Sequence, residues 1–242
     1  VDRKNQSGIV YCLSQKLTEQ CAEFLQTKGF NAYPFHAGLD SQVKIDTQDK
    51  FMTEDNIVVC ATIAFGMGID KADVRYVAHI SLPSSMEAFY QEIGRAGRDG
   101  LESDTLLIFG LQDLFQRKRF IDMSDADESF KIKEHKRLDS LIAYCDSATC
   151  RRQTLLAYFK EISEPCEKCD NCLNPPQMID GTEYAQMTLS AIYRTGQYFG
   201  SGHIVDILRG VQSDKVLAKG HNQIKTFGVG QTASADFWKT FI

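Results

Sequence analysis

Short apolar runs alternate with amphipathic segments along residues 8–110, and this alternation constrains the fold more than any other feature of the chain. The apolar runs lie at 8–13, 30–35, 57–60, 76–80 and 105–109. Between the first two, apolar residues recur at helical spacing before Gly29, and further helices are expected near 41–53 and 84–95. Strands that alternate with helices predict a doubly wound α/β domain with a parallel sheet.

A different pattern follows this domain. The acidic stretch 124–129 (SDADES) separates it from helical segments expected at 130–145 and 150–161. Two prolines at 175 and 176 then break any helix and open a new unit. Helices are expected there at 182–199 and 203–209, and a last one, at 236–242, is still running at the final residue.

Four of the eight cysteines are grouped in this second part of the chain. Cys166, Cys169 and Cys172 have the spacing C-x2-C-x2-C, and Cys150 lies sixteen positions upstream. Zinc takes four thiolate or imidazole ligands in a tetrahedron, and closely spaced cysteines let one loop supply several. An iron–sulfur cluster and a set of unliganded thiols are the alternatives. The spacing favours structural zinc, because four sulfurs leave no open coordination position.

The remaining cysteines and the composition point to an intracellular protein. Cys12, Cys21, Cys60 and Cys145 lie in apolar runs, where a cysteine usually acts as a small buried hydrophobe. No apolar run approaches a membrane span, and the first residues lack the apolar centre of a signal peptide. Net charge is −5, but residues 1–110 hold 10 Lys and Arg against 15 Asp and Glu, so the second part is neutral. A neutral second part can still carry a basic face for nucleic acid.

Two arginines stand three positions apart in the segment 91–100 (QEIGRAGRDG). Arg95 and Arg98 therefore share one helical face or flank one turn. Arginines so placed can reach the phosphates of a nucleotide held by another domain and neutralise charge that develops during phosphoryl transfer. For R-x-x-R alone a pair of surface arginines is the simpler interpretation, so the setting of the pair decides.

That setting is specific. Residues 61–70 (ATIAFGMGID) directly follow an expected strand, at the edge where α/β folds bind ligands. Gly66 and Gly68 alone indicate only a tight turn. The order strand, ATIAFGMGID, strand, helix, QEIGRAGRDG resembles motifs V and VI of superfamily 2 helicases, and its wording is close to that of the RecQ family.

Other segments resemble the same family. They are 8–15 (GIVYCLSQ, similar to motif IV), 36–39 (HAGL), 150–152 (CRR) with 155–159 (LLAYF), 169–172 (CDNC) and 206–210 (DILRG). The resemblance covers nearly the whole chain. It implies a RecA-like second helicase lobe over 1–123, a helical zinc-binding domain with four cysteine ligands over 124–176, and the start of a winged-helix domain, mostly helical and truncated, over 177–242.

The resemblance also implies nucleotide-binding residues. Arg95 and Arg98 correspond to the motif VI arginines, with Arg98 as the arginine finger. Gly68 and Asp70 correspond to motif V positions near the sugar of the nucleotide, and Gln91 to a neighbour of the nucleotide cleft. No G-x-x-x-x-G-K-[ST] loop and no D-E-x-H segment occur in the sequence, so the cradle for ATP and Mg²⁺ is expected on another lobe of the full-length protein.

Three further residues are candidates for contact with the phosphates of single-stranded DNA. Ser14, His36 and Thr62 stand at expected strand ends, where hydroxyls and backbone amides suit that contact. A partly buried, hydrogen-bonded histidine is an equal alternative for His36. Gln15 stands where the family commonly has arginine, so the resemblance carries no basic contact to that position.

The function that the resemblance implies is an ATP-dependent 3′ to 5′ DNA helicase acting in repair and recombination, of which this chain is a part that is inactive alone. Its expected partners are single-stranded DNA, duplex junctions and the N-terminal helicase lobe. The expected location is the cytoplasm, on the nucleoid. The alternatives are a helicase-like module that binds nucleic acid or a partner without hydrolysis, and a stand-alone nucleotide-binding protein with a zinc clip.

Overall fold

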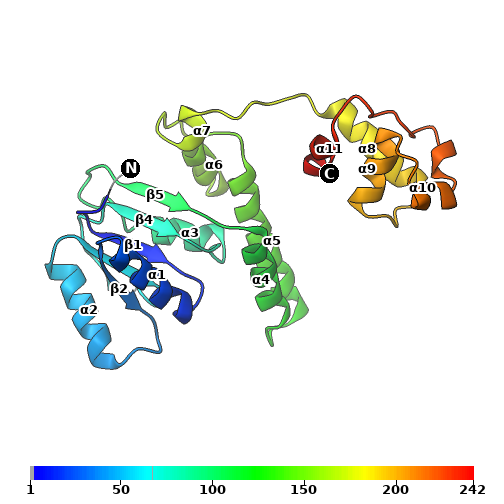
Figure 1. Cartoon of the computed structure of the whole chain (residues 1–242). Coiled ribbons are helices and arrows are strands. Elements are labelled where there is room, and N and C mark those ends of the chain that lie inside the picture. The colour runs from blue at the N-terminus through cyan, green and yellow to red at the C-terminus, as the bar shows by residue number, and fades with distance from the viewer. Residues whose placement is uncertain (1–2, 67) are drawn as a thin grey trace. The chain divides into compact units, whose positions relative to one another are not determined.

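The computed structural model describes residues 3–66 and 68–242, so residues 1–2 and Met67 of the ATIAFGMGID segment lie outside the described residues. It divides into two compact units, Val1–Pro175 and Pro176–Ile242 (Figure 1). No helix among the described residues is long and apolar enough to cross a membrane.

A five-stranded parallel sheet forms the centre of the first unit, in the order β2-β3-β1-β4-β5 (Figure 1). Its strands are β1 (Gly8–Tyr11), β2 (Asn31–Phe35), β3 (Ile57–Ala61), β4 (Tyr76–His79) and β5 (Asp104–Leu107). β3 is buried along its whole length and pairs with β1 and β2. Strands buried on both faces of a parallel sheet need continuous apolar runs, and these are the runs that the sequence contains. The predicted parallel α/β domain is confirmed.

Seven helices of this unit lie in its described residues. They are α1 (Gln15–Thr27), α2 (Ser41–Thr53), α3 (Met86–Ile93), α4 (Leu111–Asp122), α5 (Glu128–Asp146), α6 (Arg151–Tyr158) and α7 (Asp170–Leu173). Successive residues of β1 point to opposite faces of the sheet and enter two separate cores. Ile9 shares a core with Phe51 of α2, and Val10 shares the other with Ala22 of α1. α1 and α2 therefore cover opposite faces.

A third core joins α3 to the helices that follow the sheet. Its buried residues are Leu82, Met86, Phe89, Leu138, Leu141 and Leu155. α4 and α5 pack side by side (Figure 1), and Arg117 Nε of α4 donates to the carbonyl of Leu82 at 2.7 Å. The helices α5 and α6, which lead into and out of the segment with Cys150, are thus joined to the sheet domain through apolar contacts.

The second unit has only helices as its regular elements in the described residues, as predicted for this part of the chain. Its elements are α8 (Thr182–Arg194), α9 (Ser201–Arg209), α10 (Asp214–Ala218), the 3₁₀ turn η1 (His221–Gln223) and α11 (Ala235–Phe241). Trp238 is fully buried at the centre of its core, and its indole N–H donates to the carbonyl of Gly230 at 2.8 Å. A Cβ at Gly230 would lie 2.4 Å from the indole ring, so only glycine fits there.

Several helix predictions differ from the structure: the helix expected at 150–161 ends at Tyr158, and the short helices α7 and α10 were not predicted. The helix expected at 84–95 ends at Ile93, because Gly97 adopts φ +67 in the turn that follows. The helix expected at 182–199 ends at Arg194, since Gly196 and Gln197 both have positive φ. α4 was not predicted. It has no buried residue, so its sequence carries only a weak periodic signal.

Candidate functional site

The carboxyl edge of the parallel sheet gathers the three residues predicted to contact DNA. Ser14 follows β1 by three positions, and His36 and Thr62 directly follow β2 and β3. In the sheet register, Ala61 pairs with both Tyr11 and Phe35, so these three strands end side by side. Parallel topology therefore places the three predicted residues at one edge of the sheet.

Their side chains differ in availability. Ser14 is exposed and is the N-cap of α1, where its Oγ accepts from the Leu17 N–H at 3.2 Å, so its hydroxyl proton stays free to donate. His36 is 3% exposed, and its Nε2 lies 3.2 Å from Glu19 Oε1. Thr62 is half-buried, and its backbone N–H donates to the Phe35 carbonyl. Ser14 and Thr62 are therefore the more accessible donors.

The loop after β3 is held by the first of the two arginines. Arg95 lies in the turn after α3 and donates from Nη1 to the carbonyl of Gly66 at 2.6 Å. A Cβ at Gly66 would stand 2.7 Å from Arg95 Nη2, so the glycine makes room for the guanidinium. Gly68 adopts φ +83, which favours glycine. Glycine is thus required at position 66 by the nearby guanidinium and favoured at position 68 by the backbone conformation.

Arg98 contacts the end of the same loop. Its Nη1 donates to Asp70 Oδ1 at 2.5 Å and to the Ile69 carbonyl at 3.2 Å. Asp70 is exposed, and Gln91 is exposed on the last turn of α3. Arg95 and Arg98 do not share a helix. They flank the turn around Gly97 and both bind the loop that follows β3.

A buried polar group beneath this loop was missed by sequence reasoning. Tyr11 Oη donates to the carbonyl of Phe65 at 3.1 Å, and its ring stacks on His79. His79 Nε2 lies 2.7 Å from Glu92 Oε2, which ties β4 to α3. Burial raises the pKa of Tyr11 to about 12, so its hydroxyl keeps its proton and remains a donor. Nothing in the sequence distinguishes these side chains from ordinary core residues.

The four predicted metal ligands come together. The Sγ atoms of Cys150, Cys166, Cys169 and Cys172 all lie within 4.8 Å of one another. Four sulfurs bound to one zinc at about 2.3 Å would lie about 3.8 Å apart, and Cys150 and Cys169 are already at 4.0 Å. Glu167 adopts φ +57, which tightens the turn between the second and third cysteines. The cluster fits a closed tetrahedral zinc site.

Backbone amides point at these sulfurs. The Cys166 N–H donates to Cys150 Sγ at 3.2 Å, and the Arg151 N–H donates to Cys169 Sγ at 3.4 Å. Burial raises the pKa of Cys150, but N–H groups of Gln153 and Cys166 outweigh it and lower that pKa to about 6. Cys150 therefore favours thiolate, the form that binds zinc, whereas burial and the neighbouring thiols raise the pKa of Cys172 to about 12.

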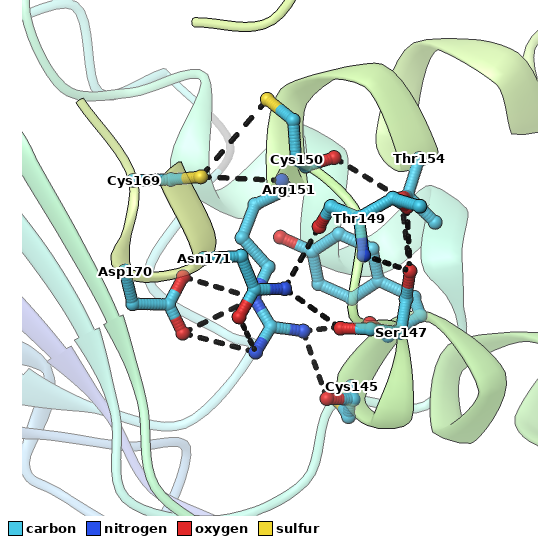
Figure 2. Close-up of polar contacts among 10 residues, drawn as sticks. Cys145, Ser147, Thr149, Cys150, Arg151, Thr154, Cys169, Asp170 and Asn171 are labelled. Carbon is cyan, nitrogen blue, oxygen red and sulfur yellow. Dashed lines mark hydrogen bonds and ion pairs between the residues drawn. The ribbon is translucent and has the colours of Figure 1, made fainter. Parts of the chain in front are cut away.

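Arg151 connects the cluster to the neighbouring helices (Figure 2). Its guanidinium donates to Asp170 at 2.9–3.2 Å and to the carbonyls of Tyr144 and Cys145 at the end of α5. Asn171 Nδ2 donates to the Ser147 carbonyl at 2.7 Å. The segments CRR and CDNC thus supply three of the four cysteines, and they also supply the side chains that orient the cysteine-bearing loops. The sequence contained these residues, but their spacing gave no sign of this contact.

Three protein-family models match successive parts of the chain. They are the helicase conserved C-terminal domain over residues 1–100, the RecQ zinc-binding domain over 111–173 and the RQC domain over 175–242. The chain belongs to the RecQ family. With the four-thiol cluster, the second match identifies a structural zinc site in this RecQ module.

Named relatives agree with this assignment. An ATP-dependent DNA helicase RecQ of Haemophilus influenzae is 40% identical over 99% of this chain and 39% of its own length. That of Bacillus subtilis is 37% identical over 94% of this chain and 39% of its own length. The RecQ-like DNA helicase BLM of Xenopus laevis is 46% identical over 70% of this chain and 13% of its own length. The chain thus spans about two fifths of the bacterial relatives.

Proposed function

We propose that this chain is the part of an ATP-dependent DNA helicase that closes over a nucleotide held by another lobe of the same protein. Residues 1–123 form the second motor lobe, residues 124–176 the zinc-binding domain and residues 177–242 the winged-helix region. The names of the bacterial relatives support the reaction, and the family models support the order of the three parts.

One observation carries the proposal: Arg95 and Arg98 converge on the loop after β3, at the ligand-binding edge of the sheet. Two guanidinium groups fixed at such an edge can bind a triphosphate and stabilise the charge that develops during phosphoryl transfer. Gly68, Asp70 and Gln91 line the approach to the nucleotide. The other lobe supplies the phosphate loop and the magnesium ligands, because this sequence holds neither motif.

DNA lies along the same edge, over the ends of β1, β2 and β3. The hydroxyls of Ser14 and Thr62 donate to phosphates of single-stranded DNA. His36 is buried and supports the loop after β2 through its contact with Glu19. Adjacent nucleotide and DNA contacts on one lobe let ATP hydrolysis move the strand. The expected direction is 3′ to 5′, at duplex junctions met in repair and recombination, and the expected location is the nucleoid.

In the zinc module, Cys150, Cys166, Cys169 and Cys172 are each a ligand of one Zn²⁺. The ion fixes the start of α6 beside α7, and Arg151 joins this pair to α5. Because α5 and α6 share a core with α3, the zinc site supports the helix that precedes the two arginines.

The test is the rate of ATP hydrolysis by the full-length protein with Arg98→Ala. Removal of an arginine finger should lower the DNA-stimulated rate by about 10³ to 10⁵ and abolish unwinding. Affinity for ATP and single-stranded DNA should stay within about tenfold, because the finger acts chiefly in the transition state. Arg119→Ala, at an exposed arginine of α4, is the matched control and should retain the normal rate.

Two results would count against the proposal. Normal turnover by Arg98→Ala would remove Arg98 from the reaction, and DNA-stimulated turnover by this 242-residue chain alone would show that the nucleotide cradle lies within it. Arg98→Lys should recover little activity, since an ammonium lacks the planar fork of the guanidinium.

A further inference from the structure

Three thiols outside the zinc cluster meet under α1. Cys60 of β3 lies with its Sγ 3.5 Å from Cys21 Sγ of α1, and Cys12, which follows β1, also contacts Cys21. Cys12 and Cys60 are buried in the core on this face of the sheet, whereas Cys21 is half-buried and reaches the surface. The expectation that all are ordinary buried hydrophobes does not account for this grouping.

The three thiols are chemically unequal. The Cys60 S–H donates to the Cys21 sulfur, and contact with Cys12 and then with Cys60 lowers the pKa of Cys21 below that of an ordinary thiol. Contact with Cys21, followed by burial, raises the pKa values of Cys12 and Cys60. The thiolate, which is the reactive form, therefore gathers on the cysteine that solvent can reach.

We propose that Cys21 and Cys60 form a reversible disulfide when the protein meets a hydroperoxide. The Cys21 thiolate attacks the peroxide O–O bond, so that sulfur gains a hydroxyl as a sulfenic acid and the remaining oxygen leaves as an alcohol or water. The Cys60 sulfur then attacks Cys21, its proton leaves with the hydroxyl as water, and the S–S bond forms. Two thiols are oxidised, and one peroxide is reduced.

The geometry suits this pair. A disulfide needs the sulfurs at about 2.05 Å, so Cys21 and Cys60 must approach by about 1.5 Å, a shift within reach of side-chain rotation and a small movement of α1. The bond would tie α1 to β3 across 39 positions of sequence, next to the strand end that carries Thr62. A dithiol reductant would reverse it by thiol–disulfide exchange.

Peptide mapping tests the proposal directly, because trypsin places the three thiols on three peptides, residues 5–16, 17–28 and 51–71. The zinc-loaded chain is treated with hydrogen peroxide, its remaining thiols are alkylated, and the digest is analysed by mass spectrometry. The expected product joins 17–28 to 51–71 with the loss of two hydrogens, and dithiothreitol removes it. Cys145 serves as an internal reference, because burial raises its pKa to about 11 and it should remain reduced.

Variants identify the partner. Cys60→Ala should abolish the cross-link and let a sulfenic-acid reagent label Cys21, while Cys12→Ala should still form it, more slowly. Cys21→Ser should prevent both products, and its circular dichroism should match the parent because the site is half-buried. A link between Cys21 and Cys12, pairing that includes Cys145, or a folded protein whose Cys21 stays unoxidised when Cys145 reacts would overturn the proposal.

Discussion

Arg98 is bound to the loop that follows β3 by two hydrogen bonds, one to Asp70 Oδ1 at 2.5 Å and one to the Ile69 carbonyl at 3.2 Å. The Arg98 side chain is 36% exposed and that of Asp70 is 83% exposed, so water screens their attraction. The pair therefore sets where the guanidinium lies more than it holds the fold together.

This exposure predicts a small effect on stability. Arg98→Ala and Asp70→Asn should each change the free energy of unfolding of this chain by no more than about 1 kcal/mol. Urea denaturation followed by circular dichroism measures the change. Such a result would separate a loss of ATP hydrolysis in Arg98→Ala from a loss of folding.

Arg75 provides the contrast. It is 9% exposed and donates to Asp99 and to the carbonyls of Asp73 and Glu102. Arg75→Ala should lower the free energy of unfolding by more than Arg98→Ala does, because it removes several hydrogen bonds of a buried guanidinium, each worth about 0.5–1.5 kcal/mol. If Arg98→Ala were as costly as Arg75→Ala, Arg98 would be a structural residue.

The sheet could be predicted because burial on both faces forces an apolar run into each strand, as in β3. The convergence of the four cysteines could be predicted too, since zinc binding by thiolates constrains the spacing of cysteines in the sequence. The end of α3 could not be placed, because it depends on Gly97 adopting positive φ beside β4. α4 escaped detection because none of its apolar side chains is fully buried: Leu111, Phe115 and Phe120 are exposed, while Leu114 and Ile121 are only half-buried.

The site was predicted unevenly for a similar reason. Arg95 and Arg98 stand in a recognisable motif, but their partners Gly66, Ile69 and Asp70 lie about 30 positions upstream. The pair formed by His79 and Glu92 joins two elements that the sequence shows only as a strand and a helix. Contacts between distant elements follow from the register of the sheet, which a single sequence does not contain.

The cluster of Cys150, Cys166, Cys169 and Cys172 should hold one zinc ion. Elemental analysis of chelator-washed protein should find about one zinc per chain, as expected for a closed four-thiolate site. Cys169→Ser should lose the metal and become sensitive to proteolysis within residues 124–180, while the parallel sheet is less affected. Iron with a visible absorption band, or well-folded protein without metal, would contradict the zinc assignment.

Arg151 should support that zinc site without being a ligand. Arg151→Ala removes the donor to Asp170 and to the end of α5, and loss of such a supporting contact typically weakens metal affinity by about 10–100-fold. Competition with a chromogenic chelator measures the affinity. Arg152→Ala changes the neighbouring exposed arginine and should bind zinc normally. Equal losses in both variants would point to charge alone.

The second unit contains a pair of histidines that should make its stability depend on pH. His203 Nε2 lies 2.8 Å from His221 Nδ1, the Phe199 ring stacks on His203, and Lys215 Nζ lies 5.4 Å from the centre of the Phe199 ring. Burial, then His221 and Lys215, lower the pKa of His203, and Asp206 opposes them only in part. The fold therefore favours neutral His203.

The direction of this pH dependence follows from how many protons the folded and the unfolded states bind. Because the unfolded chain binds the His203 proton at a higher pH than the folded unit does, this histidine's contribution to stability is complete above about pH 6.5 and is lost as pH falls toward the folded-state pKa.

The chain has one tryptophan, Trp238, buried in this unit, so its fluorescence reports the unfolding of this unit alone. The urea midpoint should be lower at about pH 5.5 than at about pH 7.5, on either side of the ordinary histidine pKa. His203→Gln should reduce that difference, whereas His135→Gln, at a half-buried histidine of α5 in the first unit, should not. An equal pH dependence in His203→Gln and the parent would mean that other groups set the acid sensitivity of the unit.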